Sequence, residues 1–188
     1  MTYDHPVIPE SAVPRAAVAA FAHVVEIYAS ETNKVAAVWR EFTDADLDFR
    51  PDSRSNTVGG IMKHQLLSER RFFGEFLGHP EPPAAEVLPA QVSVEACIAR
   101  LTELATPRLA FLADRPQEWW LESAPFFDVK RERIWIFWRR ILHTAHHRTQ
   151  LSVYLRLLGK TVPPTYGPTG DVTWKGADPT TAERGTAG

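Results

Sequence analysis

The sequence contains a single cysteine, Cys97, and no long run of apolar residues. One thiol cannot close a disulfide within the chain, so the simplest setting is a reducing cytoplasm. A membrane-spanning helix requires about 18–20 consecutive apolar residues, and no segment approaches that length. The first ten residues, MTYDHPVIPE, lack the basic and apolar segments of a signal peptide. We therefore expect a cytoplasmic protein with no membrane partner.

An excess of charge of one sign is also missing. Of the 188 residues, 21 are Lys or Arg and 23 are Asp or Glu, which gives a formal net charge of -2. Nucleic-acid binding relies on a surplus of basic residues, so we expect no nucleic-acid partner. Hydrophobic residues make up 44% of the chain, which is typical of a folded domain rather than a disordered chain.

Several common catalytic signatures are absent. The sequence has neither a Walker loop nor a GxGxxG motif, so phosphate- and dinucleotide-binding loops of the usual kinds are not indicated. It has no HExxH motif, because Thr144 and Ala145 follow His143, and it has no Glu-x-x-His pair. The zincin proteases and the ferritin-like di-iron proteins are therefore excluded as close models.

Fifteen prolines divide the chain, and four gaps between them carry apolar residues at helical spacing. These gaps predict helices over residues 15–42, 55–77, 93–105 and 129–158. We expect N-caps at Ser55 or Asn56 and at Ser93, and Gly159 is placed to end the last helix. Pro107 should end or kink the third helix before residue 113.

Residues 114–128 contain two prolines and four aromatic residues, and we interpret them as an ordered loop with little regular structure. No segment alternates between apolar and polar residues as a half-buried strand does. The predicted fold class is therefore all-α, a four-helix bundle with ordered loops and an irregular C-terminal tail. We expect one domain over residues 1–171 and a polar tail over residues 172–188.

Three histidines stand close together in the segment 143–148, HTAHHR. On a helix, His143 and His147 lie about 40° apart on one face, and Gln150 and Tyr154 continue that face. Two imidazoles one turn apart can converge on one cation, but a metal site needs a further ligand from another helix. His64 on the second predicted helix is the obvious third ligand. Three neutral imidazoles would leave a coordination position open, as catalytic metal sites do.

Other residues have plainer interpretations. Glu69 falls within the apolar arc of its helix, where it either orients a metal-bound histidine or pairs with an arginine such as Arg148. Cys97 is interpreted as a small core residue, and the role of His146 is left open. A dimer without metal, in which the histidines form hydrogen bonds within the core, is the remaining alternative to a metal site.

The run 143–151, HTAHHRTQL, leads into YLRLLG at 154–159, and together they resemble the C-terminal helix of DinB/YfiT-like proteins. The segment 64–73, HQLLSERRFF, is similar to the second helix of that family, in which a histidine precedes a glutamate. The segment 163–171, PPTYGPTGD, is similar to the one that often follows the last helix. The matches span residues 15–171. Thr149 departs from the pattern, because the family usually has Gly or Ala there.

The resemblance implies a four-helix bundle of distinctive topology, often dimeric, that holds a divalent metal on three histidines. Carried over by position, the ligands are His64, His143 and His147, the same three residues that the helix geometry selects. Zn²⁺ or Ni²⁺ is the expected metal, because both accept nitrogen ligands. Family members with known activity include thiol S-transferases and isomerases that use bacillithiol or mycothiol.

We therefore expect a metal-dependent transferase in which the metal lowers the pKa of a small thiol, and the thiolate then attacks an electrophilic substrate. Arg148, Gln150 and Tyr154 are the candidates for positioning the reactants. A metal-dependent hydrolase and a non-enzymatic, stress-related metalloprotein or ligand-binding module are the alternatives. We also expect a homodimer, for which the apolar residues 134–138 offer a face.

Overall fold

The computed structural model describes residues 6–172. The long helices of this part are α1 (Ala22–Arg40), α2 (Val58–Arg71), α3 (Val94–Ala113) and α5 (Arg133–Leu157). The shorter elements are the π-helical turn η4 (Phe72–Phe76), the helix α4 (Gln117–Leu121) and the strands β1 (Ser123–Phe126) and β2 (Val129–Glu132). Single 3-10 turns occur at Glu10–Ala12, Ala19–Phe21, Asp44–Asp46 and Ala84–Glu86. The fold is mostly helical, but a two-stranded sheet departs from the predicted all-α class.

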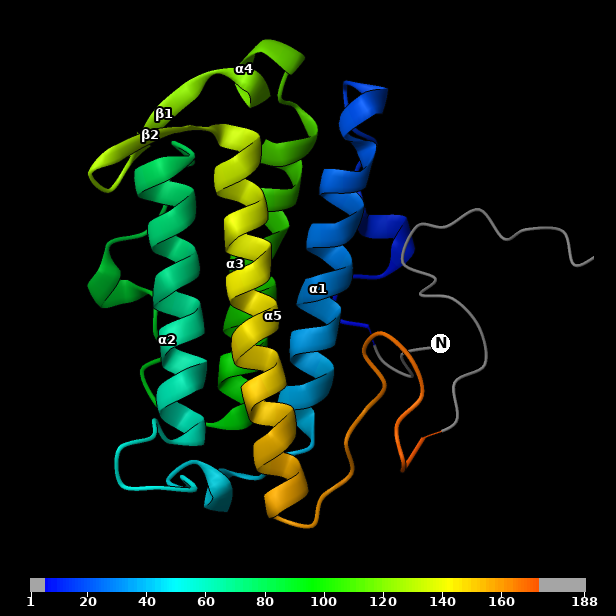
Figure 1. Ribbon diagram of the computed structural model, residues 1–188, viewed down its shortest axis with the longest axis vertical. Coiled ribbons are helices and arrows are strands. Elements are labelled where there is room, and N and C mark those ends of the chain that lie inside the picture. Colours follow the sequence, from blue (N-terminus) through cyan, green and yellow to red (C-terminus); the bar gives the residue numbers. More distant parts are fainter. Residues whose placement is uncertain (1–5, 173–188) are drawn as a thin grey trace, which may run out of the picture.

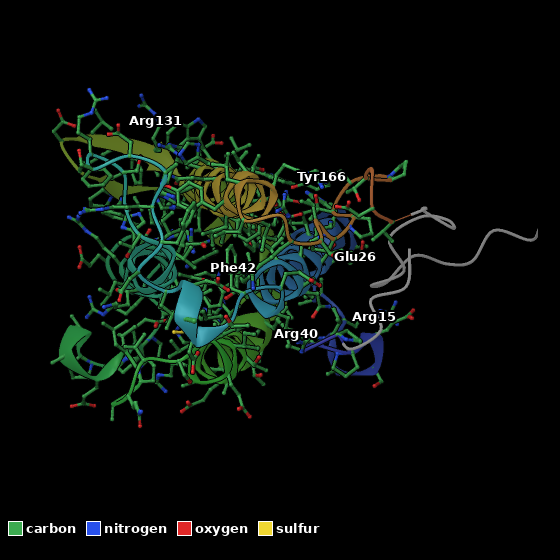
Figure 2. All side chains as sticks on the ribbon, turned by 90° about the horizontal axis from the view of Figure 1, so that it is seen from below. Arg15, Glu26, Arg40, Phe42, Arg131 and Tyr166 are labelled. Atoms are coloured by element: carbon green, nitrogen blue, oxygen red, sulfur yellow. The ribbon has the colours of Figure 1, made fainter. Side chains whose placement is uncertain are left out.

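The long helices run alongside one another, and the β1–β2 hairpin lies across one end of them (Figure 1). Helix α1 packs against α3 and α5, while α2 packs against α5 and α3. The hairpin contacts both α5 and η4. Seen along the helices, Arg131 on the hairpin and Tyr166 on the segment after α5 lie on different sides of the molecule (Figure 2). The face formed by α2, α5 and the hairpin carries His64, His143 and His147.

Local sequence explains where the helices begin and end. The Thr57 side chain accepts a hydrogen bond of 3.0 Å from the Gly60 amide, so Thr57 caps α2 in place of the predicted Ser55 or Asn56. Ser93 caps α3 as predicted. Gly159, with φ of 69°, follows the last turn of α5, and the Lys160 amide donates to the Leu155 carbonyl. This is the left-handed C-terminal turn that favours glycine.

The predicted start of the first helix and the predicted end of the third helix are wrong. Helix α1 begins at Ala22 instead of residue 15, because the Ala17 amide donates to the Ala113 carbonyl at the end of α3. Only a 3-10 turn, Ala19–Phe21, precedes it directly. Helix α3 continues through Pro107 to Ala113. Pro107 is exposed, so water can hydrate the carbonyl that loses its amide partner.

The segment 114–128 is more regular than predicted, and α5 begins at Arg133 instead of residue 129. Helix α4 is followed by antiparallel strands in which Ser123 pairs with Glu132 and Phe126 with Val129. All residues of β2 are exposed, so its sequence VKRE carries no alternation that could have indicated a strand.

The core is divided into two apolar clusters. One, near the hairpin, contains Val24, Phe73, Leu109 and Phe137. The other, at the opposite end, contains Trp39, Leu66, Leu101 and Leu155. Between them α1, α2 and α5 contribute a set of buried polar side chains, here called the polar layer: Glu31, Gln65, Glu69, Arg140, Thr144 and Arg148.

Ion pairs hold the chain that follows α5. Arg156 pairs with Asp171 at 2.7 Å, and Lys160 pairs with Asp46 at 2.6 Å. Of the predicted tail, residues 173–188 lie outside the described part of the chain. Among the helices of residues 6–172, none combines the length and the apolar composition that crossing a membrane requires.

Candidate metal centre

The structure brings the three predicted ligands together. His64 comes from α2, whereas His143 and His147 lie one turn apart on α5. One ring nitrogen from each of these three residues, here called the triad, lies within 4.8 Å of the other two. The three pairs of ring centroids are 4.6–5.2 Å apart. The triad therefore converges across the contact between α2 and α5.

The spacing of two of these nitrogens fits a tetrahedral metal. The Nε2 atoms of His64 and His143 are 3.3 Å apart. Metal–nitrogen bonds of about 2.0–2.1 Å at a tetrahedral angle place two ligand nitrogens about 3.3 Å apart. The largest separation in the triad is wider than this, so binding an ion would draw the rings together. The residues present fit a zinc-type ion with three imidazole ligands.

The second ring nitrogen of His147 has a partner that favours metal binding. Its Nδ1 lies 3.1 Å from Oε1 of Gln150, so an N–H at Nδ1 donates to the amide oxygen and leaves Nε2 free as a ligand. The Gln150 amide donates in turn to the Tyr154 hydroxyl at 3.2 Å, and that hydroxyl donates to the Asn56 carbonyl at 3.1 Å. Gln150 therefore supports His147, and Tyr154 supports Gln150.

His143 meets different partners. Arg140 donates a hydrogen bond of 3.1 Å to its Nδ1, and the Ser68 hydroxyl lies 3.4 Å from the same nitrogen. A guanidinium can only donate, so this contact requires an unprotonated Nδ1. Coordination through Nε2 would instead put the proton on Nδ1, where the Ser68 oxygen is the available acceptor.

The pKa values of the triad favour neutral rings. Burial, followed by the positive charge of Arg140, lowers the pKa of His143 to about 3. Burial followed by the Arg140 charge also lowers the pKa of His64. Burial lowers the pKa of His147, although its hydrogen bond with Gln150 opposes this shift. Neutral imidazoles are the form that binds metal ions.

Glu69 links the triad to the interior. Its carboxylate accepts hydrogen bonds from the Tyr28 hydroxyl at 2.6 Å and from Arg140 at 3.0 Å, and Arg108 lies 3.6 Å away. Burial alone would raise the pKa of Glu69, but the charges of Arg140 and Arg108 hold it below its usual value. Glu69 forms the predicted buried ion pair, but with Arg140 and Arg108 instead of Arg148, and it reaches His143 through Arg140.

The candidate Arg148 and the unassigned His146 lie apart from this arrangement. Arg148 is buried and donates to Glu31 at 2.7 Å, and its guanidinium lies 4.5 Å from the ring centre of Tyr166. Its side chain thus serves the polar layer and not the triad. His146 is exposed, and its ring lies 4.9 Å from that of His147. Cys97 is buried in the core, as expected.

A cavity of about 470 Å³ lies beside His64 and His143. Its wall includes Phe72 from η4, Phe126 and Phe127 from the hairpin and Arg139 from α5. A wider depression of about 910 Å³ lies where the end of α1 meets the start of α3, around Arg40 and Phe42 (Figure 2), but no histidine lines it. The smaller cavity is therefore the one associated with the triad.

The family model of the DinB family matches residues 16–176, which include the triad and all the long helices. The chain belongs to the DinB family. A comparison with curated protein sequences found no match. The resemblance drawn from the histidine motifs is thus confirmed.

Solved structures support the same fold. A DinB-like protein from Bacillus cereus ATCC 10987 matches with a TM-score of 0.68 and 19% identity, over 76% of this chain and 95% of that chain. The DinB-like protein YjoA from Bacillus subtilis matches with a TM-score of 0.61 and 20% identity, over 77% of this chain and 96% of that chain. At such identities the likeness concerns the fold of this DinB protein alone.

Sequence reasoning missed several residues around the triad. Ser68 and Arg140 contact His143, and the spacing of each from a histidine on its own helix, four and three residues, could have indicated them. Phe126 and Phe127 could not be placed at the cavity, because the hairpin that carries them was interpreted as a loop.

Proposed function

We propose that this DinB protein is a metal-dependent transferase that joins a small thiol to an electrophilic substrate. The observation that carries the proposal is the triad of neutral imidazoles beside a cavity of about 470 Å³. His64, His143 and His147 would hold a divalent metal, Zn²⁺ or Ni²⁺. When bound, the metal supplies Lewis acidity, which lowers the pKa of a thiol.

The residues of the chain have separate tasks in this proposal. Gln150 orients His147, and Tyr154 holds the Gln150 amide in place. The cavity receives the electrophile beside the triad and limits the access of water. The sulfur forms a bond to the electrophilic carbon, the leaving group departs with the electron pair of the bond that breaks, and the thiol proton passes to solvent.

The cavity also favours an enzyme over a metalloprotein with a closed, structural metal site. A structural zinc ion is usually surrounded by four protein ligands. Within the described residues, the triad is the group of histidine, cysteine or acidic side chains that converges closely enough for one ion. Three protein ligands would leave one coordination position of the metal open for a reactant. This holds for a transferase and for a hydrolase alike.

We further propose that a second copy of the chain covers α5. Residues 134–138 do not form the predicted face, because Ile136 and Phe137 are buried within the chain and only Trp135 among them is exposed. The exposed apolar side chains extend instead along the helix, at Trp135, Leu142, Val153 and Leu157. Their spacing places them on one face, here called the α5 stripe. Such a face can pack on its own copy about a two-fold axis.

The first experiment measures metal content. Tag-free protein should contain about one equivalent of zinc or nickel, and the His143→Ala/His147→Ala double variant should contain none. His146→Ala is the matched control, because this exposed histidine of the same helix lies outside the triad and should leave the metal content unchanged. A wild-type protein that takes up no divalent metal from an excess would overturn the proposal.

A second experiment identifies the reaction. Metal-loaded protein is incubated with bacillithiol, mycothiol or glutathione and the electrophile 1-chloro-2,4-dinitrobenzene, and free thiol is measured over time. Consumption of thiol above the uncatalysed rate, lost in the double variant, supports the transferase. Hydrolysis of 4-nitrophenyl acetate without consumption of thiol would support the hydrolase instead.

A further inference from the structure

The cavity beside the triad has an apolar wall and a cationic wall. Its volume of about 470 Å³ falls within the range of about 300–1,000 Å³ found for small-molecule sites. The apolar wall consists of Phe72, Phe126 and Phe127, and the cationic wall consists of Arg71 and Arg139. No carboxylate lines the cavity. The charged groups at its wall are therefore all positive.

Phe127 is the most unusual residue of the apolar wall. It occupies the hairpin turn with φ of 54°, in the left-handed region that residues with bulky side chains rarely adopt. Its side chain is 58% exposed, yet its ring centre lies 4.8 Å from that of Phe126 and 4.9 Å from that of Phe76. Strained residues cluster at ligand sites. The turn holds an aromatic ring at the cavity where a glycine would relieve the strain.

The two arginines differ in how much of their charge is already neutralised. Arg71 donates to Glu75 at 2.9 Å, and its guanidinium lies 5.0 Å from the ring centre of Phe127. Arg139 is exposed in the single chain, at the edge of the face of α5 that carries the α5 stripe. Within residues 6–172 its guanidinium forms neither a hydrogen bond nor an ion pair. A guanidinium with free donors at the edge of an apolar cavity is suited to a carboxylate, which it can bind through two parallel hydrogen bonds.

We propose that this cavity binds a small aromatic carboxylate. The flat apolar body of the ligand packs on Phe126 and Phe127, and its carboxylate pairs with Arg139. This assignment rests on the proposed function, because it gives the substrate class of the electrophile that would meet the thiol beside the triad. Phe127 and Arg139 determine specificity: the first selects a flat apolar group and the second selects its negative charge.

The test compares trans-cinnamate with its neutral analogue cinnamamide by isothermal titration calorimetry. Both ligands are titrated into zinc-loaded protein and into protein freed of metal with EDTA. Cinnamate should bind both forms at least about tenfold more tightly than cinnamamide, because a charge-assisted hydrogen bond contributes about 1.5–3 kcal/mol. Equal binding of the two ligands, or no binding of either at millimolar concentration, overturns the proposal.

Single substitutions test what each wall of the cavity contributes to binding. Arg139→Gln should weaken cinnamate about tenfold and leave cinnamamide unchanged, and Phe127→Ala should weaken both ligands. Arg131→Gln is the matched control, because Arg131 is an exposed arginine of the hairpin that does not line the cavity. An Arg139→Gln protein that binds cinnamate like the wild type contradicts the assignment. Circular dichroism confirms that each variant is folded.

Comparing the zinc-loaded and the metal-free protein distinguishes a failure of this proposal from a failure of the proposed function. If cinnamate binds only the zinc form and does not depend on Arg139, the carboxylate is a metal ligand, and the cavity assignment fails while the metal site stands. If the triad takes up no metal but cinnamate binding depends on Arg139, the anion site stands and the transferase fails.

Discussion

His143 and His147 differ in what their second ring nitrogen meets, and this difference predicts opposite effects of mutation. Nδ1 of His147 faces an acceptor, Oε1 of Gln150, whereas Nδ1 of His143 faces a donor, the guanidinium of Arg140. Coordination through Nε2 places a proton on Nδ1. Gln150 therefore supports metal binding, and Arg140 opposes it.

Replacement of Gln150 should weaken the metal site. We expect Gln150→Ala to lower zinc affinity about tenfold, because loss of such an outer partner commonly costs 10- to 100-fold. Gln150→Glu should restore most of the affinity, since a carboxylate also accepts the Nδ1–H bond. Competition with a chelating dye measures the affinity, with the exposed neighbour Thr149→Ala as control. If Gln150→Ala binds zinc like the wild type, Gln150 does not orient His147.

Replacement of Arg140 should strengthen the site. Arg140→Gln removes both a positive charge and a hydrogen bond that coordination must break, while the Arg148–Glu31 pair still holds α5 in place. We therefore expect zinc affinity at pH 8 to rise about tenfold. Arg139→Gln is the control. It removes a positive charge from the same helix, but Arg139 does not contact Nδ1 of His143, so the zinc affinity should change less. A fall in zinc affinity for Arg140→Gln, in protein shown to be folded, would contradict this account.

At the scale of elements, a buried ion pair joins the chain after η4 to α3. Both carboxylate oxygens of Glu81 accept hydrogen bonds from Arg108, at 2.7 and 2.6 Å, and His79 lies 2.8 Å from one of them. Burial would raise the pKa of Glu81, but these partners hold it below its usual value of 4.5. The pair of Glu81 and Arg108 holds the chain that follows η4 against α3.

The stabilising effect of Glu81 should depend on pH. Because its pKa is lower in the folded protein than in the unfolded chain, its contribution is fully present above about pH 4.5 and is lost as the pH falls through the folded pKa. We expect Glu81→Gln to lower the free energy of unfolding by about 3 kcal/mol at pH 7 and by less at pH 3.5. Urea unfolding of metal-free protein at both pH values measures this. A difference that does not change with pH would show that the pair does not act through its charge.

The elements also explain how much could be predicted from the sequence. Helical spacing placed His143, His147, Gln150 and Tyr154 on one face, because local geometry alone decides that. It could not decide which arginine reaches Glu69. Arg140 and Arg148 lie eight residues, or about 80° around the helix, apart on α5, and both are buried. Which of them meets Glu69 depends on the axial position of α5 relative to α2, and tertiary packing sets that position. Tertiary contacts also determine whether the hairpin forms, because its exposed strand β2 has no alternating sequence pattern that could have predicted it.

At the scale of the whole molecule, the α5 stripe predicts self-association. Light scattering coupled to gel filtration should give about twice the chain mass of 21.2 kDa. Leu142→Arg and Val153→Arg place charges in the stripe and should return the protein to the chain mass. Leu121→Arg is the control, because Leu121 is an exposed leucine of α4 outside the stripe. A wild-type protein with the mass of one chain would contradict the proposed dimer.

The polar layer between the two apolar clusters has a consequence for axial register. Charged pairs add to apolar packing in setting the axial position of α5, because Arg140 and Arg148 have fixed partners in Glu69 and Glu31. Displacing α5 by one turn, about 5.4 Å, would separate both pairs and leave buried charges unpaired, at a cost of about 3–5 kcal/mol for each broken pair. The same displacement would carry His143 and His147 past His64. The buried charges thus hold α5 in the axial position at which the three imidazoles lie close together.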